Sequence, residues 1–167
     1  MNGKYFESDY EEALIDLLVQ QGWEYSYGGS IARNNREVLL VDDLTLYLQQ
    51  CYTDLQASDI EEIINRLRYM SGQTHYELLR NTFYLVRDGF RYTRNLNGEI
   101  FDIEFVDFKP QNKNNIYRCV NQFEVGYGLK ADIRIPDVLL FVNGIPLCIF
   151  ELKNPTDFNA TIADAYD

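Results

Sequence analysis

The sequence predicts an α/β protein with helices in its first half and a mixed β-sheet in its second. Apolar residues recur at helical spacing up to about residue 88, and from about residue 99 they alternate at the period of two that is typical of strands. The length of 167 residues suits one domain with a core of its own. We therefore expect a single domain over 1–167, with a helical section at about 42–88 and a sheet at about 97–153.

The first expected element is a helix over 8–21. Its apolar stripe has helical spacing and consists of Tyr10, Ala13, Leu14, Leu17 and Leu18. Ser8 is the expected N-cap, and Glu11 stands three residues later, which is the spacing of a capping box. Gly22 follows as a C-cap candidate, and a short strand is expected over 23–27.

Three more helices are expected in the helical section. The first follows the acidic pair Asp42-Asp43, the second covers 59–70 behind a cap at Ser58, and the third runs from about 75 to 86. The helical period is clearest in the second of them, where the apolar positions are Ile60, Ile63, Ile64 and Leu67.

The second half of the chain predicts strands. They are expected over 99–108, 116–126, 136–142 and 145–152. Asn97-Gly98 is a turn signal before the first strand, and Asn143-Gly144 between the last two is the strongest hairpin signal in the chain. Cys148 lies in an apolar run, so we expect it in the core. From about 160 to 167 the pattern indicates the start of a helix.

Composition limits the possible partners. Lysine and arginine number 15 against 26 aspartate and glutamate, so the net charge is −11. Such a surface argues against a free-standing, non-specific nucleic-acid binder, but it is compatible with an enzyme whose acidic site binds a divalent cation. Arg87, Arg91 and Arg94 with Tyr92 could form a DNA-facing patch or simply solubilise the helical section. The three cysteines form no CxxC pair, and no signal peptide or membrane span is evident, so we expect a cytoplasmic protein.

Three ionisable residues stand at the open end of the apolar hairpin. Asp137 begins one strand, and Glu151 and Lys153 end its partner. Residues two apart on a strand point to one face, so Glu151 and Lys153 share a face. Two converging carboxylates suit Mg²⁺, and a lysine beside them can orient water or stabilise developing charge. A bare Glu-x-Lys is usually a solvated salt bridge, but the apolar frame around this one favours phosphodiester hydrolysis.

The magnesium-site interpretation requires a particular register between the two strands of the hairpin. With a strict two-residue turn at Asn143-Gly144, Val142 would pair with Ile145 and Asp137 with Phe150. Asp137 and Glu151 would then face opposite sides of the sheet. To share a metal ion they need either an odd loop or a bulge that shifts the register by one residue.

The same residues resemble a known family. Residues 136–137 and 151–153 match the PD-(D/E)xK nuclease motif. The fuller string over 136–155 resembles the N-terminal nuclease domain of the R (restriction) subunit of type I restriction-modification enzymes. Its Asn-Gly-x-Pro-Leu segment argues against other nucleases of the superfamily, such as repair enzymes. The resemblance extends to 10–15, 22–23 and 121–125.

The resemblance implies a restriction-endonuclease-like fold, in which a mixed sheet is flanked by helices, with a helical insertion in the first half. It implies that Asp137 and Glu151 bind Mg²⁺ with the carbonyl group of Leu152. Lys153 would activate or position the attacking water, and Glu11 would support the site from the first helix. For Glu11, the capping-box role suggested by its spacing remains equally open.

The resemblance also implies partners and a larger chain. Double-stranded DNA and the methyltransferase and specificity subunits of the restriction complex are the expected partners, and ATP would act only in the full-length subunit. Members of the family often have a Gln-x-x-x-Tyr motif on the helix after the Glu-x-Lys strand, and the given sequence stops before that motif. The sequence also contains no P-loop. We therefore expect an N-terminal fragment of a longer chain, and we expect this fragment to cut DNA poorly on its own. The alternative function is a nuclease-fold docking module that holds the motor subunit to its methyltransferase partners.

Overall fold

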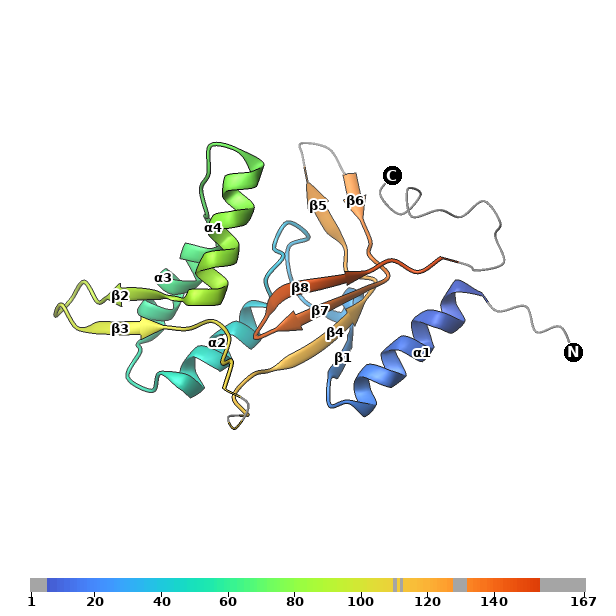
Figure 1. Cartoon of the computed structure of the whole chain (residues 1–167), viewed down its shortest axis with the longest axis horizontal. Helices are drawn as coiled ribbons and strands as arrows, with labels where there is room; N and C mark the ends of the chain where they lie inside the picture. Colours follow the sequence, from blue (N-terminus) through green and yellow to red (C-terminus); the bar gives the residue numbers. More distant parts are fainter. Residues whose placement is uncertain (1–5, 110, 112, 128–131, 154–167) are drawn as a thin grey trace, which may run out of the picture. The chain divides into compact units, whose positions relative to one another are not determined.

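The computed structural model describes residues 6–109, 111, 113–127 and 132–153 (Figure 1). The chain divides into two compact units, which we name the sheet unit (1–38 and 117–167) and the helical unit (39–116). Within the described residues there are four α-helices and a mixed sheet, so the predicted α/β class is confirmed.

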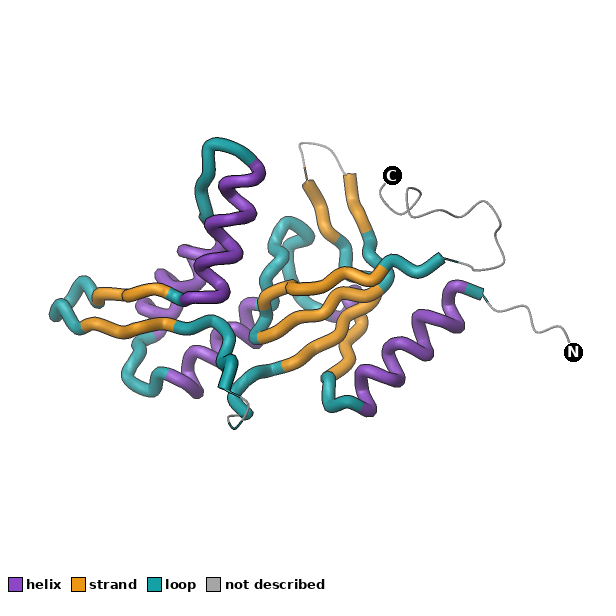
Figure 2. The backbone as a smooth tube through the Cα atoms, in the orientation of Figure 1, coloured by secondary structure: helices purple, strands orange, loops and turns teal. Residues whose placement is uncertain are grey.

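The sheet unit is built on a four-stranded sheet in the order β1-β4-β7-β8 (Figure 2). Its strands are β1 (Glu24–Tyr27), β4 (Tyr117–Asn121), β7 (Val138–Val142) and β8 (Ile145–Phe150). β1 is parallel to β4, and the other neighbours are antiparallel. A single 3₁₀ turn, η1 (Gly28–Ser30), follows β1, and a separate antiparallel pair joins β5 (Val125–Tyr127) to β6 (Asp132–Arg134).

Helix α1 (Glu7–Gln20) packs on one face of this sheet. Leu18 forms a buried cluster with Cys119 of β4 and Val138 of β7. The helix begins one residue before the expected cap: Phe6 is the N-cap, and the carboxylate of Asp9 accepts a hydrogen bond from the Phe6 N–H at 2.7 Å. The predicted cap at Ser8 is therefore wrong.

The helical unit consists of three helices and a hairpin. They are α2 (Val41–Cys51), α3 (Ala57–Arg68), α4 (His75–Asp88), β2 (Phe90–Thr93) and β3 (Ile100–Ile103). Its core side chains are at most 1% exposed and include Leu44, Tyr47, Leu48, Ile63, Ile103 and Phe105. The apolar period predicted for α3 is confirmed, although the N-cap is Gln56 rather than Ser58.

A buried ion pair connects the β2–β3 hairpin to α3. Arg94 lies 2.8 Å from Asp59, and both side chains are less than a tenth exposed. The hydroxyl of Tyr92 shares its one proton between two carboxylates, Asp59 at 2.9 Å and Glu62 at 3.0 Å. Burial by itself would raise the pKa of Asp59. The hydrogen bonds that Asp59 accepts from Arg94, the Gln56 N–H and Tyr92 outweigh burial, so the pKa of Asp59 is lowered. Because Arg94 and Tyr92 are buried, they do not form the DNA-facing patch that the sequence suggested.

The structure differs from the sequence-based expectation in several strands. The strand expected over 99–108 is confined to β3, and its partner β2 and the short strand β6 were not foreseen. The strand expected over 116–126 divides into β4 and β5 because Gln122 adopts a left-handed conformation with φ of 51°. Cys148 is exposed because β8 is the edge strand. The helix start expected over 160–167 lies outside the described residues.

Candidate functional site

The β7–β8 hairpin contains the register shift on which the predicted site depends. Asn143 and Gly144 both have positive φ, 52° and 76°, and form a two-residue turn that pairs Val142 with Ile145. Between Leu140 and Phe141 the register shifts by one residue, so that Leu147 of β8 is an extra residue without a partner on β7. This β-bulge supplies the one-residue register shift that Asp137 and Glu151 need in order to share a face of the sheet.

The bulge sets Asp137 opposite Glu151. Val138 pairs with Phe150, and the same register continued by one residue brings Asp137 and Glu151 together at the open end of the hairpin. Cross-strand partners lie on the same face of a sheet. Without the bulge, Asp137 would lie opposite Phe150, and Glu151 would point to the other face.

The Asp137 carboxylate bridges the two strands. Its Oδ2 accepts a hydrogen bond from the Leu152 N–H at 2.5 Å. This contact is charge-assisted and fixes the carboxylate against the end of β8. The Leu152 main chain, which was expected to supply a carbonyl ligand, is thus adjacent to Asp137.

The electrostatics of Glu151 link the remaining groups. Partial burial and the negative charge of Asp137 raise the pKa of Glu151, whereas the positive charges of Lys153 and Arg134 lower it. The first two effects dominate, so the pKa lies above its ordinary value. The charges of Asp137 and Lys153 therefore both act on the Glu151 carboxylate.

The two carboxylates fit a divalent cation. Two carboxylates on one sheet face repel each other, and a bound cation would relieve that repulsion. Mg²⁺ usually takes one or two carboxylates and keeps several waters. Within the described residues there is no group of three or more His, Cys, Asp or Glu side chains able to hold a metal ion. The predicted set accordingly has two carboxylates, from Asp137 and Glu151, and one main-chain carbonyl.

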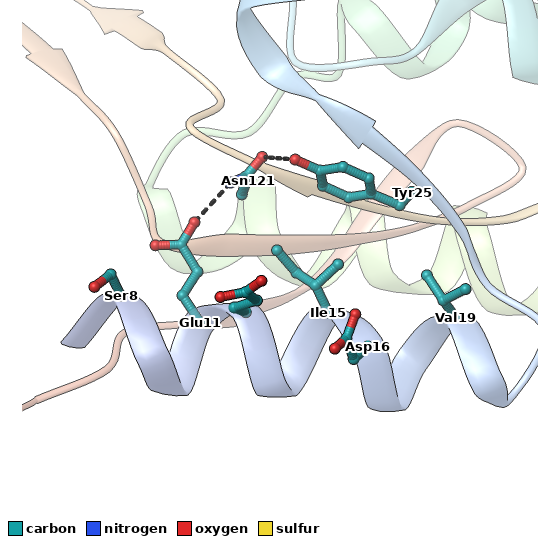
Figure 3. A pocket seen from close by; sticks show the side chains of 8 residues that line it. Ser8, Glu11, Ile15, Asp16, Val19, Tyr25 and Asn121 are labelled. Carbon is teal, nitrogen blue, oxygen red and sulfur yellow. Dashed lines mark hydrogen bonds between the residues drawn. The ribbon is translucent and has the colours of Figure 1, made fainter. Parts of the chain in front are cut away.

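Glu11 has a different partner. Its Oε1 accepts a hydrogen bond from Asn121 Nδ2 at 2.7 Å, and Asn121 Oδ1 accepts one from the Tyr25 hydroxyl at 3.0 Å (Figure 3). The capping-box role considered for Glu11 is wrong, because Asp9 fills that position. Asn121 pairs with Val138, the residue after Asp137, so Glu11 is connected to the β7–β8 hairpin through β4.

The three hydrogen-bonded residues Glu11, Asn121 and Tyr25 line a pocket of about 400 Å³. Its lining comes from α1, β1 and β4 and consists of Ser8, Glu11, Glu12, Ile15, Asp16, Val19, Tyr25 and Asn121 (Figure 3). Asp137, Glu151 and Lys153 are not part of the lining. The structure therefore brings three of the four predicted side chains together and places Glu11 in a neighbouring pocket.

Sequence reasoning missed three residues around the site. Arg134 acts on Glu151 from the end of β6, and its only signal is its position three residues before Asp137. Asn121 and Tyr25 hold Glu11, and a polar amide at the end of an apolar strand is the signal that could have indicated Asn121.

Comparison with known families decides the identity. The family described as Type I restriction enzyme R protein N terminus matches residues 4–167, which is almost the whole chain. The chain belongs to this family. The resemblance drawn from residues 136–155 is thereby confirmed.

Two curated relatives agree with this assignment of an R protein N terminus. The type I restriction enzyme HindI endonuclease subunit of Haemophilus influenzae is 34% identical over 96% of this chain and 16% of its own length. A protein of Methanocaldococcus jannaschii, provisionally named type I restriction enzyme MjaIXP endonuclease subunit, is 28% identical over 94% of this chain and 16% of its own length. The chain thus spans about a sixth of the length of these curated relatives.

In this R protein N terminus, none of the helices within the described residues has both the length and the apolar character needed to cross a membrane.

Proposed function

We propose that this region is the Mg²⁺-dependent endonuclease module of a type I restriction enzyme R subunit, with a restriction-endonuclease-like fold. The observation that carries the proposal is the β-bulge at Leu147, which sets Asp137 opposite Glu151 with Lys153 beside them. A hairpin with this turn and no bulge would separate the two carboxylates. The bulge is therefore the feature that turns a common sequence pattern into a possible active site.

The reaction is hydrolysis of a DNA phosphodiester bond. A water oxygen forms a new bond to phosphorus, the bond from phosphorus to the leaving sugar oxygen breaks, and a proton is transferred to that oxygen. Asp137, Glu151 and the Leu152 carbonyl would hold Mg²⁺, which when bound supplies Lewis-acid activation of water and phosphate.

The chain's own residues would do the positioning. The hydrogen bond from the Leu152 N–H holds the Asp137 carboxylate in place, so that this ligand does not have to be ordered at the moment of reaction. The ammonium group of Lys153 would donate hydrogen bonds to the attacking water or to a phosphate oxygen. Arg134 is also positively charged and close enough to Glu151 to influence it, so it is a candidate for contacting the DNA backbone.

The proposed setting is a cytoplasmic restriction complex. Its other members would be double-stranded DNA and the methyltransferase and specificity subunits, with ATP consumed elsewhere in the complete subunit. Glu11 would act as a supporting carboxylate held by Asn121.

The experiment uses the complete R subunit assembled with its partner subunits. Asp137→Asn, Glu151→Gln and Lys153→Ala should each lower the rate of plasmid cleavage by at least about a hundredfold, because each removes a group that positions the reaction. ATP hydrolysis should stay at the wild-type rate. Asp132→Asn makes the same chemical change as Asp137→Asn at an exposed carboxylate on β6 and serves as the control. Wild-type cleavage by any of the three site variants would disprove the role of that residue.

A second candidate function is docking, with little cleavage by this region itself. It is favoured by the net charge of −11, which opposes binding to phosphate backbones. Titration of Mn²⁺ into the complete subunit separates the two functions. The nuclease proposal expects saturable Mn²⁺ binding that Asp137→Asn weakens, and a docking module expects no effect of that substitution.

A further inference from the structure

The four strands of the main sheet share one end, where β1, β4 and β8 end and β7 begins (Figure 1). The last row of cross-strand partners at this end consists of Tyr27, Asn121, Val138 and Phe150. The residues one position beyond this row are Gly28, Gln122, Asp137 and Glu151. Because β7 lies between β4 and β8, Gln122 stands next to Asp137 on the side away from Glu151.

Gln122 has a backbone conformation that its residue type rarely adopts. Its φ of 51° lies in the left-handed region, where glycine fits without strain and asparagine and aspartate are the commonest residues with a side chain. A turn that served only to separate β4 from β5 would be formed more easily by glycine. Residues held in such a conformation against their preference cluster at functional sites. The conformation of Gln122 therefore points to a function of its side chain.

The neighbours of Gln122 fix its main chain on both sides. A Cβ at Gly28 would lie 2.4 Å from the Gln122 carbonyl oxygen, so the two segments approach closely only because residue 28 is glycine. Phe123 is fully buried, and its ring centre lies 5.2 Å from that of Phe141 on β7 and 3.4 Å from the Arg33 guanidinium carbon. Gln122 thus cannot leave the left-handed region without disturbing these contacts.

The side chain of Gln122 is available for a ligand. It is exposed, and among the described residues its amide makes no hydrogen bond. The amide of the preceding residue, Asn121, is by contrast occupied by Glu11 and Tyr25. Neighbouring strands lie about 4.8 Å apart, so the Gln122 side chain is long enough to reach a group bound at Asp137.

A neutral hydrogen-bond donor at this position complements the charges of the site. Asp137 and Glu151 are negative, as is a DNA phosphate, and Lys153 brings a positive charge from the β8 side. The Gln122 amide would bring two N–H donors from the β4 side without adding to the negative charge. Fixed donors that meet a reacting phosphate oxygen stabilise the charge that develops on it during cleavage.

We propose that Gln122 is a further catalytic residue of the nuclease site, whose side-chain amide donates a hydrogen bond to a non-bridging oxygen of the phosphate that is cleaved. The left-handed backbone holds the amide beside Asp137 before DNA binds, so that this donor does not have to be ordered during the reaction. This inference rests on the proposed nuclease function of the same site.

The test measures single-turnover DNA cleavage by the complete R subunit assembled with its partner subunits. Gln122→Gly should lower cleavage roughly ten- to a hundredfold, the range expected for one hydrogen bond to a charged group. Because glycine relieves the strain, the same variant should melt at the wild-type temperature or above it and should hydrolyse ATP at the wild-type rate. This combination of lost activity and kept stability is not expected of a structural residue.

Two further variants identify the amide as the active group. Gln122→Glu keeps the size of the side chain but replaces the donors by a negative charge, so it should lower cleavage at least as much as Gln122→Gly. Gln122→Asn keeps the amide in a residue type that accepts positive φ, so it should retain more cleavage than Gln122→Gly. The matched control is Gln20→Glu, which makes the same chemical change at an exposed glutamine at the end of α1 and should cleave like wild type.

The outcomes separate this inference from the proposed function. If Gln122→Gly and Gln122→Glu cleave at the wild-type rate while Asp137→Asn is inactive, the role of Gln122 is wrong and the nuclease proposal stands. If Asp137→Asn also cleaves normally, the proposed function is wrong and this inference fails with it. A Gln122→Gly variant that loses cleavage together with thermal stability and ATP hydrolysis would show a structural role and overturn the inference. Equal cleavage by the glycine and asparagine variants would exclude the amide as the active group.

Discussion

The bulge at Leu147 leads to a prediction about chain length in β8. Deleting Leu147 removes the residue that has no partner and leaves every pair of the β7–β8 ladder intact, including the alignment of Asp137 with Glu151. Inserting one alanine between Phe150 and Glu151 keeps the same ladder but sets the alanine opposite Asp137. The deletion should therefore preserve cleavage, and the insertion should abolish it.

The magnitude follows from strand geometry. The insertion moves Glu151 by about 3.3 Å along the strand and turns it, with Lys153, to the opposite face. Misplacement by about 1 Å can lower a rate roughly a hundredfold, so the insertion should lower cleavage by more than that. The deletion removes a side chain that is 51% exposed, so it loses little buried surface and should cost about 1 kcal/mol or less of folding stability.

The assay compares single-turnover DNA cleavage by the two length variants in the assembled complex. Titration of Mn²⁺ into each variant provides a second measurement that does not depend on cleavage. The insertion should weaken Mn²⁺ binding as strongly as Glu151→Gln, and the deletion should leave it unchanged. Wild-type cleavage by the insertion variant, or an inactive but folded deletion variant, would refute the reasoning from register.

Three further predictions concern stability. Because the pKa of Glu151 is raised in the folded state, the protonated carboxyl stabilises the fold relative to the ionised one. This stabilisation is complete below about pH 4.5, and it is lost as pH rises through the pKa of the folded state. Glu151→Gln should therefore raise the melting temperature at pH 7 in metal-free buffer and leave it unchanged at pH 4. Tyr92→Phe should lower the free energy of unfolding in urea by about 1–3 kcal/mol, because it removes hydrogen bonds to carboxylates, whereas Tyr69→Phe, at a side chain that is 74% exposed, should not change it. Gly98→Ala should lower the free energy of unfolding by about 1 kcal/mol, because only its positive φ opposes a side chain. Gly89→Ala should lower it by roughly 2 kcal/mol more, because a Cβ there would also lie 2.0 Å from a main-chain oxygen. Equal losses of stability measured by calorimetry would contradict this account.

The helices could be predicted from the sequence because their signals are local. The apolar positions of α3, from Ile60 to Leu67, are fixed by the helical period and are buried as expected. The helix ends were less predictable, since Ser8 and Ser58 have good capping chemistry but lie one or two residues inside the helices. In both cases an aspartate in the first turn accepts the backbone N–H of the N-cap residue instead.

The strands were harder to predict because their limits depend on distant partners. No local pattern marked β2, which exists because Phe90 to Thr93 can pair with β3 beyond the Asn97-Gly98 turn. The break between β4 and β5 depends on Gln122, a residue type that rarely adopts positive φ. Exposure of Cys148 follows from strand order, which an apolar run does not reveal.

The site combines both kinds of information. The sequence predicted that Asp137, Glu151 and Lys153 meet only if the hairpin departs from a regular ladder, and it left open whether an odd loop or a bulge would do this. The turn at Asn143-Gly144 is regular, because both residues have the positive φ of a two-residue turn, so the correction had to occur within β8. A bulge there shifts the register without lengthening the loop, and it places the extra residue, Leu147, where its side chain can remain exposed. The apolar turn end of the hairpin can then keep its tight pairing while the open end brings two carboxylates to one face.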